Sequence, residues 1–125
     1  MKEKNKVLLF GSKGFIASNF IKKNKNHKII SLDRANLFKI KKKNYNFKKI
    51  DLSLKSLDTS KYKFNYQFDC AILTSYNINF KNSSRKKFIS ENTRIIKNSL
   101  KICKINNIKK LIYISSAAVY GIKKK

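Results

Sequence analysis

The sequence predicts an α/β fold: a doubly wound parallel sheet with strand order 3-2-1-4-5, enclosed between two layers of helices. Short apolar runs, typical of strands buried on both faces, alternate along the chain with segments whose apolar residues recur at helical spacing. Connections between parallel strands are short and right-handed, so few other strand orders fit this alternation. We therefore expect a three-layer αβα architecture in one domain, residues 1–125.

Length and composition restrict the class of protein. A chain of 125 residues builds a single hydrophobic core, and 42% hydrophobic residues predict that it folds. Its apolar runs are too short to cross a bilayer and its N-terminus lacks a signal-peptide pattern, so we expect a cytoplasmic protein without a membrane partner. Cys70 and Cys103 lie in apolar stretches without metal-ligand spacing, which is typical of reduced core residues and predicts no metal site.

The formal net charge of +25 raises the question of nucleic-acid binding. Arginine, the residue that base-edge contacts favour, occurs only at positions 34, 85 and 94, and lysines are spread over the whole chain. This distribution resembles a general residue bias more than a binding face. We therefore expect only nonspecific attraction to nucleic acid or anionic lipid at low salt.

The chain opens with a strand, a glycine turn and a helix. Residues 7–10 form an unbroken apolar run, Gly11 and Gly14 follow, and Ile16, Phe20 and Ile21 then recur at helical spacing. In such a unit the first glycine permits a tight turn and the second lets the backbone approach a pyrophosphate at the helix N-terminus. Ala17 stands where a third small residue packs the helix against the strand. The pattern predicts a dinucleotide-binding turn.

The second predicted strand, residues 28–33, ends on an acidic residue. Asp33 lies about 20 residues beyond the glycine turn, where a carboxylate binds the adenosine ribose in folds of this kind. An exposed aspartate in a loop is the ordinary alternative, but the chain has only six acidic residues. An acidic residue at the end of this strand favours NAD, whereas Arg34 next to it suits the 2′-phosphate of NADP. We therefore favour NAD as the cofactor, with NADP as the alternative.

The middle of the chain is predicted from shorter patterns. Residues 37–40 are expected to form a turn of helix, residues 45–50 the third strand and residues 53–60 a short helix. The aromatic residues within 61–68 are either a stacking surface for nucleic acid or core residues beneath a loop, and we favour the core.

The second half continues the alternation. Residues 69–75 form an apolar fourth strand, residues 76–84 a loop, and Ser83 or Ser84 caps a helix that runs to about residue 104 and ends at Asn106-Asn107. Residues 111–115 form the fifth strand. The inward face of the long helix is expected to carry Ile89, Ile96, Leu100 and Cys103, with Phe88 and Ile95 alongside and Asn92 between them.

Taken in order, these pieces resemble the extended short-chain dehydrogenases, the NAD-dependent epimerase/dehydratases that act on nucleotide sugars. This resemblance implies a Rossmann-type fold and an oxidoreductase function. The matching stretches are Gly11-Ser-Lys-Gly-Phe-Ile-Ala-Ser, Leu32-Asp33, Asp51-Leu52, Asn92, and Ile114-Ser-Ser-Ala-Ala-Val-Tyr-Gly121.

The resemblance also implies roles for individual residues. The turn from Gly11 to Ala17 would hold the pyrophosphate, Asp33 the adenosine ribose, and Asp51 with Leu52 the adenine. Ser116 would hydrogen-bond the substrate oxygen that is oxidised or reduced. The full set of expected cofactor-binding residues is Gly11, Ser12, Lys13, Gly14, Phe15, Ile16, Asp33, Arg34, Asp51, Leu52, Thr74, Ser75 and Ser115.

The chain departs from the family in two places. The fourth strand ends in Ile72-Leu-Thr-Ser75 instead of a His-Leu-Ala-Ala-like sequence. The family's base, a Tyr-x-x-x-Lys pair on a later helix, has no credible counterpart. Tyr45/Lys49 lies on a predicted strand at the far side of the sheet, and Tyr120/Lys124 follows Ser116 too closely for a helix to present both.

We therefore expect the N-terminal, dinucleotide-binding portion of an epimerase/dehydratase, a fragment inactive alone that meets a nucleotide sugar only if the C-terminal part is supplied. Two alternatives remain. One is a non-catalytic nucleotide-binding or interaction module. The other, more remote, is a basic protein associated nonspecifically with nucleic acid.

Overall fold

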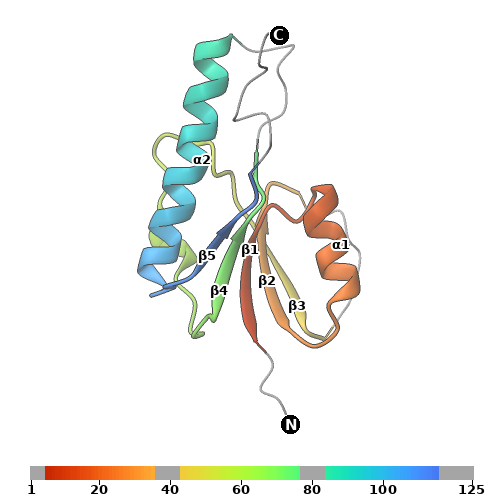
Figure 1. The fold of residues 1–125 in the computed structure, drawn as a ribbon. Coiled ribbons are helices and arrows are strands. Elements are labelled where there is room, and N and C mark those ends of the chain that lie inside the picture. The colour runs from red at the N-terminus through yellow and green to blue at the C-terminus, as the bar shows by residue number, and fades with distance from the viewer. Residues whose placement is uncertain (1–4, 36–42, 77–83, 116–125) are drawn as a thin grey trace.

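The computed structural model describes residues 5–35, 43–76 and 84–115. Five parallel strands form one sheet in the order β3-β2-β1-β4-β5, and two α-helices lie on opposite faces of it (Figure 1). This confirms the predicted doubly wound fold. The elements are β1 (Lys6–Phe10), α1 (Phe15–Lys23), β2 (Lys28–Asp33), β3 (Tyr45–Lys49), the 3₁₀ helix η1 (Thr59–Tyr62), β4 (Cys70–Leu73), α2 (Arg85–Ile105) and β5 (Leu111–Tyr113).

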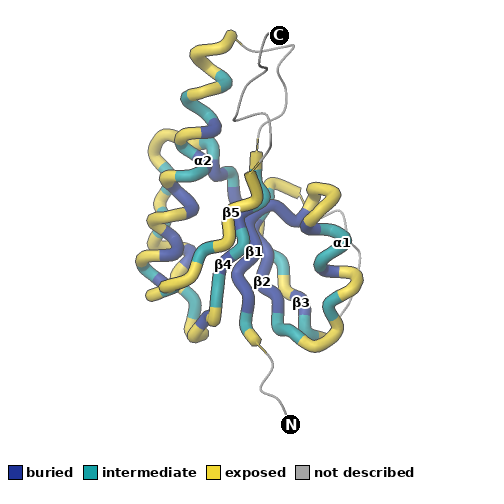
Figure 2. The backbone as a smooth tube through the Cα atoms, viewed as in Figure 1, coloured by how far each residue is buried: buried dark blue, intermediate teal, exposed yellow. Residues whose placement is uncertain are grey.

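The central strand β1 is buried on both faces because each face is covered by a different helix. Leu8 and Phe10 belong to the cluster that includes Ile102 of α2, whereas Leu9 belongs to the cluster that includes Ile21 of α1. Successive side chains of a strand point to opposite faces, so an unbroken apolar run serves both cores. Figure 2 shows the resulting buried centre of the sheet.

The loop between β3 and η1 corrects one prediction. Residues 53–60 do not form the predicted α-helix: residues 53–58 are turns and irregular backbone, and a 3₁₀ helix begins at Thr59 and ends at Tyr62. The Asp51 carboxylate accepts a hydrogen bond from the backbone N–H of Ser53, and Asp58 accepts one from that of Ser60. Aspartate side chains that bind the backbone two residues later offer an alternative to helical hydrogen bonding.

The aromatic residues of the 61–68 segment belong mainly to the core. Tyr62 and Phe68 are buried in the α2-side cluster, and Phe64 packs edge-to-face on Phe68 at a centroid distance of 5.8 Å. Tyr66 is more exposed and lies under the Lys28 ammonium, 3.8 Å from its ring centroid. The segment is therefore not a continuous stacking surface.

Helix α2 has its predicted ends, but its buried face was predicted only in part. Ser84 caps it, accepting a hydrogen bond from the Lys87 N–H, and Asn107 just beyond it adopts a positive φ of 53°. The predicted inward residues Ile89 and Leu100 are 52% and 47% exposed. Asn92, Ile95 and Cys103 are buried as predicted, and the other buried residues are Asn98, Ser99 and Ile102.

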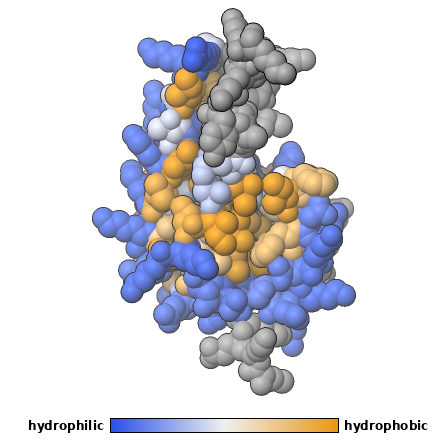
Figure 3. Space-filling view, viewed as in Figure 1, coloured by the Kyte–Doolittle hydropathy of each residue, from blue (hydrophilic) through white to orange (hydrophobic). Residues whose placement is uncertain are grey.

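The α1-side face of β4 and β5 is not covered by the described helices. Ile112 pairs with Ile72, which belongs to the α1-side cluster, yet Ile112 is 39% exposed. Figure 3 shows apolar side chains gathered on this face between the two helices. The first turn of α1 adds to the apolar surface, because Ile16 is 53% exposed, whereas Ala17 and Ile21 are buried.

Neither described α-helix is both long and apolar enough to span a membrane. The predicted helical turn at residues 37–40 and most of the predicted loop at 76–84 lie outside the described residues.

Candidate functional site

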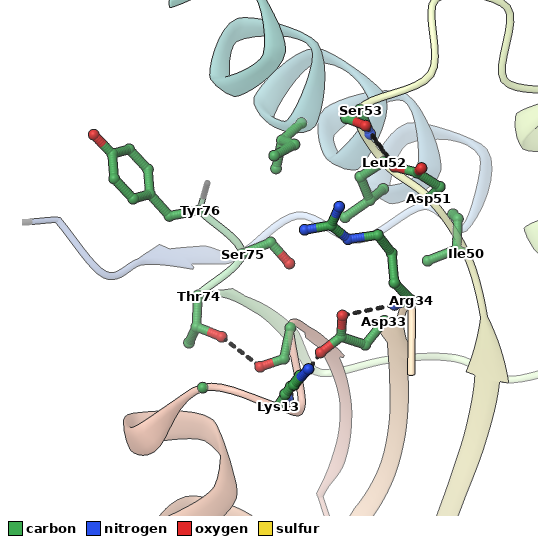
Figure 4. A pocket seen from close by; sticks show the side chains of 13 residues that line it. Lys13, Asp33, Arg34, Ile50, Asp51, Leu52, Ser53, Thr74, Ser75 and Tyr76 are labelled. Carbon is green, nitrogen blue, oxygen red and sulfur yellow. Dashed lines mark hydrogen bonds between the residues drawn. The ribbon is translucent and has the colours of Figure 1, made fainter. Parts of the chain in front are cut away.

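A pocket of about 390 Å³ opens where the strands of the sheet end, between the glycine turn, the end of β2, the loop after β3 and the end of β4 (Figure 4). This is the edge of a doubly wound sheet at which ligands bind. Its lining brings together predicted site residues from four separate segments: Gly11, Lys13, Gly14, Asp33, Arg34, Asp51, Leu52, Thr74 and Ser75. It also includes Ile50, Ser53, Tyr76 and Ile95, which were not predicted.

Gly11 is required by the turn itself. Its φ is +91°, and a Cβ there would lie 2.7 Å from Ser75 Oγ and 2.8 Å from Thr74 Oγ1. Thr74 Oγ1 donates to the carbonyl oxygen of Phe10 or Gly11, at 2.8 and 2.9 Å. The close approach of β4 to the turn therefore leaves no room for a side chain, and only glycine adopts this backbone without strain.

Gly14 is different, because the protein's own packing does not require it. It is the N-cap of α1 with an ordinary extended conformation, φ −67° and ψ 159°. A Cβ at Gly14 would meet nothing nearer than the Gly11 carbonyl oxygen, at 4.0 Å. The first turn of α1 contains no acidic residue, so its positive helix end is not neutralised from within. Open backbone at such a helix end fits a phosphate group.

Asp33 ties the end of β2 to the glycine turn. Its Oδ2 accepts a hydrogen bond from the Lys13 backbone N–H at 2.8 Å, and its Oδ1 accepts one from the Arg34 N–H at 2.6 Å. Figure 4 shows the carboxylate beside the turn and the Arg34 side chain extending across the pocket. A carboxylate oxygen accepts more than one hydrogen bond, so Asp33 keeps capacity for a ligand hydroxyl.

The loop after β3 supplies a wall that is apolar with one acidic group. Leu52 and Ile50 are buried, and Ile95 of α2 lines the same pocket. Asp51 Oδ1 accepts from the Ser53 N–H at 2.9 Å and from Ser53 Oγ at 2.6 Å. An apolar surface with a nearby hydrogen-bond acceptor is suited to one face and the amino edge of a purine base.

Some predicted residues do not line the pocket. Ser12 is fully buried beneath the turn, and its Oγ has no hydrogen-bond partner among the described residues. Phe15 and Ile16 lie exposed on the first turn of α1, and Ser115 is exposed after β5. Ser116, the predicted catalytic residue, lies outside the described residues.

The unpredicted members of the lining come from chain segments that the sequence patterns treat as core or loop. Ile95 was placed beside the inward stripe of the long helix and is buried where that helix passes the pocket. Tyr76 follows β4 by three residues, and its ring packs edge-to-face on Phe88 of α2 at 5.6 Å. Its position just after a central strand is the only feature of the sequence that could have indicated Tyr76 as a pocket residue.

Other candidate groups are inert. Burial raises the pKa of Cys103 to about 11 and also raises that of Cys70, so both thiols stay protonated at neutral pH. Tyr45 is buried on β3, and its hydroxyl shares a 2.8 Å hydrogen bond with Ser31 Oγ, as expected for a core tyrosine and not for a general base. Among the described residues no His, Cys, Asp and Glu side chains cluster as a metal site.

Comparison with known proteins agrees with the resemblance found in the sequence. The family model described as the NAD dependent epimerase/dehydratase family matches residues 7–125. A comparison with curated protein sequences found no match.

Many solved structures share the fold. They include the Bordetella bronchiseptica enzyme WbmH in complex with NAD+ (19% identity, TM-score 0.75, covering 96% of this chain and 42% of that one). They also include Helicobacter pylori ADP-L-glycero-D-manno-heptose-6-epimerase (23%, 0.73, 98% and 43%) and Bifidobacterium longum UDP-glucose 4-epimerase in complex with NAD+ and UDP (25%, 0.73, 97% and 40%). This chain thus spans about two fifths of the length of these neighbours.

Proposed function

This chain belongs to the NAD-dependent epimerase/dehydratase family, and from that membership we propose that its pocket binds NAD(H). The observation that carries the proposal is Gly14: an open backbone position at a helix N-terminus, which neither conformation nor packing requires to be glycine. The Asp33 carboxylate lies next to it, hydrogen-bonded to Lys13 of the same turn. A diphosphate and its attached ribose fit this pair of features.

The assignment of groups follows the order of the lining residues. The turn from Gly11 to Gly14 would hold the pyrophosphate, Asp33 would accept hydrogen bonds from the adenosine ribose, and the wall formed by Asp51 and Leu52 would flank the adenine. Thr74 and Ser75, on the β4 side, would face the remainder of the dinucleotide. A bound nicotinamide supplies the acceptor or donor of a hydride.

Cofactor choice depends on two neighbouring residues. Asp33 suits the free 2′-hydroxyl of NAD and repels a 2′-phosphate, whereas Arg34 and Lys13 would attract that phosphate. Because the carboxylate is held in place by two backbone N–H groups, we propose that NAD is preferred over NADP.

We further propose that these 125 residues bind the cofactor without turning over a nucleotide sugar. The residue implied to contact substrate is Ser116, and no credible Tyr-x-x-x-Lys pair accompanies it in the sequence. The neighbours that carry the names of nucleotide-sugar epimerases are more than twice as long. A sugar substrate would be met only with those additional residues present.

The proposal is tested by titrating the purified chain with NAD in a calorimeter and following the heat of binding. We expect saturable binding of one NAD per chain, and no product when UDP-glucose and NAD are added together. The matched control is nicotinamide mononucleotide, which lacks the adenosine phosphate and should not bind. Absence of NAD binding by a folded chain would overturn the binding assignment, and sugar turnover would overturn the inactivity.

A further inference from the structure

The loop that forms the adenine wall is attached to helix α2 by an unusual set of contacts. Asn98 Nδ2 donates hydrogen bonds to the carbonyl oxygens of Leu52 and Leu54, at 2.8 and 3.0 Å. Arg94 Nε donates to the carbonyl oxygen between them, that of Ser53, at 2.6 Å. Three successive carbonyls of one loop are thus bound by two side chains of one helix.

These contacts are built into the protein's interior. Asn98 is 6% exposed, and both hydrogens of its amide are used. Arg94 is half-buried, and its guanidinium also donates to Ser90 Oγ at 3.4 Å. Ile95 and Ile102 anchor the same helix in the core. The helix is therefore a fixed support, and the loop takes its position from it.

The loop in turn sets the pocket wall. Leu52 and Ser53 line the pocket themselves, and Asp51 lines it while its carboxylate holds the Ser53 N–H and hydroxyl. A shift of the carbonyls at 52–54 would therefore move the acidic group and the apolar surface together. Neither Asn98 nor Arg94 lines the pocket, and their hydrogen bonds to the loop connect them to residues that do.

We propose that Asn98 and Arg94 are positioning residues for the adenosine end of the pocket: by binding the carbonyls of residues 52–54 they fix Asp51 and Leu52 where an adenine would lie. This inference rests on the proposed NAD-binding function. It adds a second layer to the site, because binding depends on side chains of α2 that the ligand does not touch.

The same helix offers a matched control. Asn106, at its C-terminal end, is 5% exposed and donates to the carbonyl oxygens of Tyr62 and Ile102, at 2.8 and 2.9 Å. Its Oδ1 accepts from the Phe64 N–H at 2.8 Å. Asn106 thus anchors a loop as Asn98 does, with similar burial, but none of its partners lines the cofactor pocket.

The test compares Asn98→Ala, Asn98→Asp and Asn106→Ala by thermal unfolding and by calorimetric titration with AMP and NAD. The aspartate variant keeps the shape of asparagine and removes the donor. We expect all three to unfold at lower temperature, because each leaves buried carbonyls unpaired. Only the Asn98 variants should also bind AMP and NAD more weakly, by about tenfold, since displaced groups no longer meet the ligand.

Equal affinity of the Asn98 variants and Asn106→Ala for AMP would show that Asn98 is merely structural and overturn the proposal. If the Asn98 variants do not fold, Arg94→Ala, which removes the two hydrogen bonds of a half-buried side chain, decides the matter. Arg94→Ala should weaken AMP binding about threefold. Arg94→Lys should weaken it to the same extent, because lysine lacks the Nε donor that binds the Ser53 carbonyl oxygen. Unchanged AMP affinity in Arg94→Ala would then be the contradicting result. Failure of the unmodified chain to bind NAD is a separate outcome that concerns the proposed function itself.

Discussion

The two sides of the pocket differ in how firmly their residues are held by hydrogen bonds and packing. On the side of β1, β2 and β3, the glycine turn, Asp33 and the 51–54 loop are linked to one another and to α2 by hydrogen bonds between chain segments. On the side of β4 and β5, Thr74 is fixed to the turn, but Tyr76 is 50% exposed and Ser115 is exposed two residues after the short strand β5. The sheet face next to it carries the exposed residues Ile112 and Ile114.

This difference corresponds to the two roles proposed for the pocket, which are binding of the adenosine diphosphate part on one side and contact with the reacting nicotinamide part on the other. The first side contains the groups suited to the adenosine diphosphate part of a dinucleotide, and they are held before any ligand arrives. The second side contains the end of β4 and Ser115, which the family resemblance assigns to the nicotinamide end, and apolar surface is exposed there among the described residues (Figure 3). This contrast agrees with the proposal that the chain binds the cofactor and would need additional residues to recognise a substrate.

The largest effect is expected where the two sides meet, at Gly11. Gly11→Ala would force a side chain into φ +91° and against Ser75 and Thr74. We expect the free energy of unfolding to fall by about 2–5 kcal/mol, from backbone strain and overpacking. Urea denaturation followed by circular dichroism measures it. Stability equal to that of the unmodified chain would mean that β4 does not press on the turn as described.

Gly14→Ala is the complementary change on the binding side. Its φ of −67° and open surroundings allow alanine, so the free energy of unfolding should change by less than about 1 kcal/mol. NAD affinity should nevertheless fall by about tenfold or more, because the new methyl group occupies the approach of the pyrophosphate. Calorimetric titration checks the affinity. Loss of stability without loss of binding would reverse the roles given to the two glycines.

The glycine turn and the strands next to it could be predicted from the local sequence pattern. The strand–turn–helix order and the position of Asp33 follow from spacing within one βαβ unit, and so does the strand order, because right-handed crossovers leave little choice. The bounds of β2 were predicted without error at residues 28–33. Predictions of this kind are correct where the tertiary packing favours the same secondary structure as the local sequence.

The buried face of α2 shows where pattern fails. Hydropathy places Ile89 and Leu100 inside and gives no signal for Asn98, whereas the structure buries Asn98 and exposes both apolar residues. The burial of Asn98 is explained by the carbonyls of a loop more than forty residues earlier, at 2.8 and 3.0 Å, and no sequence period reports such a partner. The wrongly predicted helix at 53–60 has the same origin, since that loop is organised by aspartates and by α2.

A smaller effect on binding is expected at Asp33, and it sharpens the cofactor assignment. Asp33→Asn keeps the size of the side chain but removes its charge and one acceptor, so NAD affinity should fall about five- to tenfold. NADP should lose less, because the repulsion of its 2′-phosphate disappears while Lys13 and Arg34 remain. The NAD-to-NADP affinity ratio, measured by titration, should therefore decrease.

Asp69→Asn is the control for that change. Asp69 Oδ2 also accepts a backbone N–H, that of Lys6 at 2.6 Å, but it precedes β4 at the opposite end of the sheet from the pocket. Its replacement should leave the ratio of NAD to NADP affinity unchanged. A ratio that moves equally in both variants would attribute the effect to the net charge of the chain and not to the site.

The smallest expected effect tests the comparison without any mutation. ADP-ribose contains every part of NAD that the β1–β2–β3 side would hold and lacks the nicotinamide. If the second side contributes little, ADP-ribose and NAD should bind with affinities within about threefold, a difference of ~0.7 kcal/mol. Calorimetric titration of the same sample with both ligands measures this. A much tighter complex with NAD would show that Thr74, Ser75 and Tyr76 already form an effective nicotinamide site, and the two sides would then be equal partners in binding.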